Sequence, residues 1–200
     1  MALISRRTLV VIALLCPLAG AGLRASSLVQ FNLADLVERS DRIYRATVVE
    51  IEQGTVQAGG GEIPIIIYRV RVEEGFKGNL VSPGGNGLVE IRMVNGGITR
   101  DSGGARFLSP LPRMPTIVLG ESYLLFTTLP SAIGLSTTVG LGQGCFHLTG
   151  SPGQEQVLNE FNNLGLFSGM ENPGLPPSGS FSYPAFSEII RTELTSGEGN

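Results

Sequence analysis

The stretch IIIYRVRVEEGFKG, at Ile65–Gly78, decides the fold class of this chain. Apolar and charged side chains alternate through it, with Ile66, Tyr68, Val70 and Val72 on one side and Arg69, Arg71 and Glu73 on the other. Successive side chains of a β-strand point to opposite faces, so this period of two predicts a half-buried strand over 65–74. The glycines and prolines that follow, at 75–87, predict a turn region.

Similar patterns along the chain predict the other elements. Strands are expected at 42–53, 88–94, 119–128, 137–141 continuing as 145–149, and 156–161, and amphipathic helices at 32–40 and 183–194. We expect a flexible loop at 54–61 and a long irregular loop at 98–115. With 28 Gly, 12 Pro and no Trp, short elements and many turns are favoured. These features predict a mainly β fold, a small OB-like barrel of five to six antiparallel strands with a short N-terminal helix and a C-terminal helix.

The N-terminus has the order of a secretory signal. Arg6 and Arg7 precede an almost wholly apolar run at Thr8–Ala21, and small residues follow near Ala25. We therefore expect residues 1–25 to be a signal peptide and the protein to be exported, to the periplasm or the extracellular space. The Sec route is favoured over the twin-arginine route that Ser5–Leu9 also suggests. A lipidated Cys16 and a retained N-terminal anchor are the alternatives.

The remaining chain divides by composition. Residues 26–166 are expected to form the barrel domain, the Pro/Gly/Ser-rich residues 167–182 a linker, and residues 183–200 a C-terminal helix and tail.

Charge excludes some partner classes. Removing Arg6, Arg7 and Arg24 from the 14 basic residues leaves 11 against 17 acidic ones, a net charge of −6. Nucleic acid and anionic membrane surfaces both require a basic face, so we expect neither nucleic-acid binding nor membrane binding after signal cleavage. The expected partner is an unidentified protein or extracellular ligand.

The order of several motifs resembles a group of exported bacterial proteins of unassigned activity. The motifs are SDxIxxxxVxxIE at Ser40–Glu52, VxVEExxKG at Val70–Gly78, GExYLLF at Gly120–Phe126 and GxxQGxF around Leu141–Phe146. The resemblance implies a netrin/tissue-inhibitor-like OB-type barrel and an exported location. Inhibitors of that type depend on an N-terminal cysteine and several disulfides, which the exported chain lacks, so we do not expect metalloprotease inhibition by their mechanism.

Cys145 and His147 are the weak candidates for catalysis. They lie two residues apart on one strand face, where a His could activate a thiolate. Same-face neighbours on a strand are about 6.5–7 Å apart at the backbone, which is long for a catalytic hydrogen bond. One His and one Cys also fall short of a structural zinc site. We therefore expect no catalytic residues, no metal and no cofactor.

The long loop supplies the candidate contact residues, Phe107, Leu108, Leu111 and Met114. They are expected either to form an exposed apolar patch or to fold back over the end of the barrel. The leading hypothesis is an exported, non-catalytic binding module that uses the barrel face, this loop and the loop at 54–61. A Cys/His-dependent hydrolase or redox enzyme and a structural component of the cell envelope are the alternatives.

Overall fold

The computed structural model describes residues 29–80, 87–95, 98–101, 104–107, 114–171 and 174–197, with the backbone alone at 98–101 and 104–107. The fold is mainly β, as predicted. Its strands are β1 (Arg42–Ala58), β2 (Gly61–Lys77), β3 (Leu88–Val94), β4 (Ile98–Asp101), β5 (Gly104–Phe107), β6 (Ser122–Thr127), β7 (Cys145–Thr149), β8 (Gln156–Asn159) and β9 (Phe181–Ser182). The helices are α2 (Leu33–Arg39), the 3-10 turn η1 (Leu141–Gly144) and α3 (Tyr183–Gly197).

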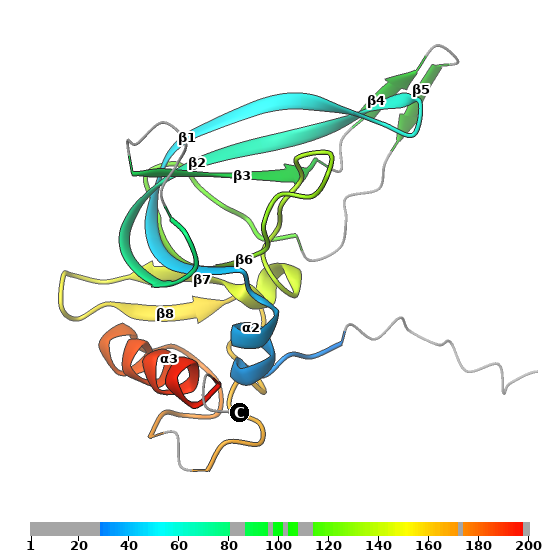
Figure 1. Cartoon of the computed structure of the whole chain (residues 1–200). Coiled ribbons are helices and arrows are strands. Elements are labelled where there is room, and N and C mark those ends of the chain that lie inside the picture. Colours follow the sequence, from blue (N-terminus) through cyan, green and yellow to red (C-terminus); the bar gives the residue numbers. More distant parts are fainter. Residues whose placement is uncertain are drawn as a thin grey trace, which may run out of the picture.

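Seven of these strands form one antiparallel sheet in the order β3-β2-β1-β6-β7-β8-β9, and β4 and β5 form a separate hairpin. The pairing of β1 with β2 shifts register at three places, the last between Val48 and Glu50. Such bulges bend a strand and increase its twist. β1 accordingly curves away from β6, and beyond the last bulge the hairpin extends outward (Figure 1). We call this outer part, Glu50–Ala58 with Gly61–Arg69, the arm.

The expectation of a closed barrel is wrong. Strands β3 and β9 end the sheet and do not pair with each other. The outer margin of β3 is instead bonded by the loop after β6, where Ser136 N donates to Arg92 O (2.9 Å) and Ser136 Oγ accepts from Arg92 N (3.1 Å). At the other end, β9 has only two residues and leads directly into α3.

Both faces of the sheet are buried around β6, which separates two apolar clusters. Leu124 and Phe126 face the helix-side core, which also holds Phe146 and Phe186. Tyr123 and Leu125 face the opposite way, into the strand-side core enclosed between β6, β7 and the curved β1, β2 and β3. The alternation of a strand explains why the middle of β6, Tyr123–Phe126, is apolar at every position, because each of its faces is covered.

The two helices lie together beneath β7 and β8 (Figure 1). Asn32 begins α2 with a capping box, in which its side chain accepts from Asp35 N and its own N–H donates to the Asp35 carboxylate. Leu33, Leu36 and Val37 of α2 and Phe186 and Ile190 of α3 enter the helix-side core. Both helices were predicted, to within a few residues at their ends.

Several stretches differ from the sequence-based expectation. Residues 54–61 are not a loop, because β1 and β2 continue to a two-residue turn at Gly59-Gly60, whose φ angles of 61° and 80° suit glycine. In the second segment, Ile98–Asp101 pairs with Gly104–Phe107. Residues 167–182, expected to be a linker, place Phe167 and Phe181 in the helix-side core and form β9.

Candidate functional site

Cys145 lies in the strand-side core at the start of β7, paired with Leu125. Its side chain is buried, and that burial, helped by the charge of Glu160, raises the pKa of the thiol far above its ordinary value. A nucleophilic cysteine requires the thiolate. The buried environment of Cys145 therefore disfavours the thiolate, which is the form that nucleophilic catalysis requires.

His147 lies further along β7, where its side chain is about 40% exposed. Its ring stacks on Tyr123 at 5.1 Å between centroids, and Nε2 lies 3.0 Å from a carboxylate oxygen of Glu121. The hydrogen bond of the ring is thus made with an exposed carboxylate, while the thiol of Cys145 is inside the core. The structure places the two side chains in different environments on the same strand.

The predicted contact residues fall in several places. Phe107 ends β5, where only the backbone is described, and Leu108 and Leu111 lie outside the described residues. Met114 is half-buried and packs against the strand-side core. The β4–β5 hairpin contacts β2 and lies beside the outer end of the arm (Figure 1). The segment at 54–61 and the described strands of the segment at 98–115 are therefore neighbours, and each contains paired strands.

The arm has one unpaired margin, on the side of β1 away from β2. β6 pairs with β1 only over Arg42–Thr47, and the last bonds to that side are made by Val48, with Gly120 and Glu121. Within the described ranges, no backbone group bonds to the margin beyond Val48. We call the outward margin of Ile51–Gln57 the β1 margin.

The proline in β2 shows which backbone groups point to this margin. Pro64 is paired with Thr55, has no N–H, and its oxygen accepts from Asn95 N (2.8 Å) on the β3 side. Thr55 and Pro64 are therefore a pair without mutual hydrogen bonds, and the N–H and C=O of Thr55 point outward. The alternation of an antiparallel ladder gives the same direction to Ile51, Gln53 and Gln57. All four of these residues are exposed.

The other ends of the sheet are protected, in contrast to the β1 margin. Ser136 bonds β3, and β9 is short, both of which are common ways to block an edge. The β1 margin is longer and contains neither proline nor lysine. A long exposed edge without these features is a template for another strand.

Charges next to the β1 margin are already paired. Arg69 bonds both Glu50 (2.5 Å) and Glu52 (2.9 Å) across the arm. The hydrogen bond from Arg69 lowers the pKa of the Glu50 carboxyl, and these carboxylates raise the pKa of Arg69. One guanidinium thus offsets only part of the charge of two carboxylates, so the face of the arm keeps a net negative charge.

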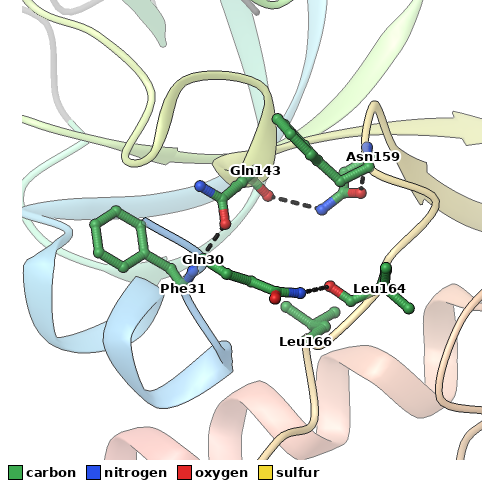
Figure 2. Close-up of a pocket in the computed structure, with 7 residues that line it drawn as sticks. Gln30, Phe31, Gln143, Asn159, Leu164 and Leu166 are labelled. Carbon is green, nitrogen blue, oxygen red and sulfur yellow. Dashed lines mark hydrogen bonds between the residues drawn. The ribbon is translucent and has the colours of Figure 1, made fainter. Parts of the chain in front are cut away.

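A separate pocket of about 180 Å³ lies where residues 29–32 cross η1 and the turns after β8 (Figure 2). Four apolar side chains and three amides line it: Phe31, Phe161, Leu164, Leu166, Gln30, Gln143 and Asn159. Sequence reasoning did not find this pocket, because its residues are far apart in the chain and none belongs to a recognisable motif.

Gln143 holds the N-terminal segment against this pocket. Its Oε1 accepts from Phe31 N (2.8 Å), and its Nε2 donates to Val29 O (2.9 Å). Its backbone oxygen accepts from Asn159 Nδ2 (3.1 Å), and Gln30 Nε2 donates to Leu164 O (2.7 Å). Gly140 and Gly142 line this region because they allow the close approach of Phe31 and Glu160, which an added Cβ would obstruct.

Comparisons with known proteins give no further assignment. A scan against protein-family models finds no match to this chain, and a search of curated proteins finds none. In the described part of the chain, no helix is both long and apolar enough to cross a bilayer. Among the residues that the structure describes, no group of three or more His, Cys, Asp or Glu side chains could hold a metal ion.

Proposed function

We propose that this chain is an exported, non-catalytic interaction module that receives an extended segment of a protein partner along the β1 margin. The observation that carries the proposal is the unpaired margin itself, on an arm that extends beyond the core. The export pattern at residues 1–25 supports the location, and it is independent of the fold.

The non-catalytic part of the proposal is supported by the environments of the two candidate catalytic residues. Cys145 is buried with a raised pKa, and His147 is bonded to Glu121. Among the residues that the structure describes, no nucleophilic side chain bonds to the His147 ring, so the His147–Glu121 pair has no nucleophile to activate. The enzyme hypothesis is therefore the less supported of the two.

The margin has the groups that strand addition needs. Ile51, Gln53, Thr55 and Gln57 each direct one N–H and one C=O outward, and main-chain hydrogen bonds supply affinity in this binding mode. Each such bond has a net value of about 0.5–1.5 kcal/mol. Because the margin already has the geometry of a strand, only the partner segment must be ordered on binding.

Thr55 gives the sharpest test. Thr55→Pro removes an outward N–H but leaves the β1–β2 hydrogen bonds, since Thr55 makes none with Pro64. Thr55→Val is the matched control, because it keeps the N–H and the β-branched shape. Short random peptides displayed on phage are selected on the unmodified protein, and the enriched peptides are measured by calorimetry and by amide hydrogen exchange.

We expect enriched peptides to protect the amides of Ile51, Gln53, Thr55 and Gln57. Thr55→Pro should weaken their binding at least about fivefold, from the loss of roughly 1 kcal/mol, whereas Thr55→Val should leave it unchanged. Protection confined to another surface, equal binding by both variants, or no enriched peptide contradicts the proposal. A dimer that Thr55→Pro dissociates would also overturn it, because the occupant would then be a second copy of the chain.

A further inference from the structure

The pocket between residues 29–32 and the turns after β8 has features that the proposed function does not use. The elements around it, residues 29–32 and the turns after β8, lie at the helix end of the molecule, away from the arm (Figure 1). Gln143 and Asn159 lie along one side of it, and Gln30, Leu164 and Leu166 along the other (Figure 2). Its apolar walls and few amides are the composition of a small-molecule site.

Among the described residues, none of those that line the pocket is charged. The neighbouring carboxylate of Glu160 lies behind Gly142, and one of its oxygens accepts from Thr116 N (2.8 Å). A charged ligand would leave water without gaining an ion pair, and that desolvation is unfavourable. The lining therefore selects for neutral molecules.

The amides retain hydrogen-bond donors. Asn159 is only 7% exposed, and its Nδ2 carries two hydrogens, one of which is donated to Gln143 O. The second hydrogen has no hydrogen-bond acceptor among the described residues. Gln30 is exposed, and its Nε2 likewise donates only one hydrogen to a described residue, at Leu164 O. Gln143 differs, because both ends of its side chain hold the backbone of residues 29–31. A bound molecule therefore meets donors and should carry an acceptor.

The volume sets the size of that molecule. Cavities of about 150 Å³ take up benzene, whereas sites for drug-sized ligands and cofactors have about 300–1,000 Å³. At about 180 Å³, this pocket holds one ring with a small substituent and excludes nucleotides and larger cofactors. We propose that the pocket binds a neutral, single-ring compound with a carbonyl or similar acceptor, of the size of benzamide.

The test is a titration of the isotope-labelled protein with three probes, followed by NMR. Benzamide has the ring and the acceptor, toluene lacks the acceptor, and benzoate adds a charge. We expect benzamide to shift the side-chain amide signals of Gln30 and Asn159 saturably, with a dissociation constant on the order of 1 mM or below. Toluene should bind several-fold more weakly, and benzoate about tenfold more weakly or worse.

A pair of exposed leucines supplies the matched variants. Leu164 lines the pocket and is 63% exposed, whereas Leu129 is 50% exposed and lies outside it, so neither truncation should unfold the protein. Leu164→Ala should weaken benzamide binding about threefold to tenfold by removing part of one wall, and Leu129→Ala should not change it. Shifts that occur elsewhere, benzoate binding as tight as benzamide, equal binding by the two variants, or no shift with any probe would each overturn the assignment.

Discussion

Phe186 is the residue through which α3 and the turn-rich stretch before it become part of the core. Its side chain is fully buried, and its ring lies 5.3 Å from that of Phe146, 5.1 Å from Phe181 and 6.1 Å from Phe167. Phe→Ala substitutions in cores cost about 3–5 kcal/mol, and each aromatic pair contributes about 0.5–1.5 kcal/mol beyond area burial. With three ring pairs lost, we expect Phe186→Ala to cost about 4–5 kcal/mol.

Urea unfolding measures this cost as a change in midpoint at constant slope. For a domain of this size, the same loss should lower Tm by roughly 8–20 °C. Phe186→Leu is the graded control, since it keeps most of the apolar volume, and it should cost about 1–2 kcal/mol. A loss below about 1 kcal/mol for Phe186→Ala would refute the reasoning. A separate early transition for α3 would refute it too, because α3 would then be an independent unit.

Three further outcomes follow from individual residues. Cys145 should react with iodoacetamide only after denaturation, because burial raises its pKa; rapid labelling of the folded protein, detected by mass spectrometry, would contradict this. Gly78→Ala should cost more than about 2 kcal/mol in urea unfolding, because φ is 84° and the added Cβ would overlap the backbone oxygen of Asp41; a neutral result would contradict that close approach. The pKa of the Glu155 carboxyl is lowered by hydrogen bonds from its own N–H and from the N–H of Gly153, and by Arg45. The ionised carboxylate therefore stabilises the folded state above the unfolded-state pKa of about 4.3, and this stabilisation is lost as pH falls through the folded-state pKa. Glu155→Gln should therefore lose less stability than the unmodified protein between about pH 6 and pH 3, and equal losses in the two proteins would contradict the assignment.

Local patterns in the sequence predicted most of the regular structure. The period of two in β2 and β3, the Asn32 cap of α2 and the apolar stripe of α3 are all short-range signals, and the structure forms each of these elements. The same patterns did not predict the full length of the two strands that form the arm. Residues 54–58 and 61–64 do not alternate clearly, and they become strands because they pair with each other across the Gly59-Gly60 turn. That glycine pair between two strand patterns was the signal that could have predicted the hairpin.

The structural features that the sequence could not predict depend on contacts between residues that are far apart in the chain. Closure of the sheet is prevented where Ser136 bonds Arg92, a contact between residues 44 positions apart. Phe167 and Phe181 are isolated aromatic residues within Gly- and Pro-rich sequence, so no periodicity indicates that they are buried. The pocket has the same origin, because Gln30 and Leu164 meet only after residues 29–32 have crossed η1. Strand periodicity placed Cys145 and His147 on one face, but it could not show that one is buried and the other exposed.

Pro64 also determines how far an assembly built on this protein can grow. It leaves the β2 side of the arm without a donor at that position, while Ser136 bonds β3 and β9 is only two residues long. Among the described elements, a molecule that has accepted a strand on β1 therefore offers no second edge of comparable length. Sheets that polymerise need two such edges in each subunit. Addition at the β1 margin should consequently stop after one strand, giving a complex of fixed stoichiometry rather than a fibre.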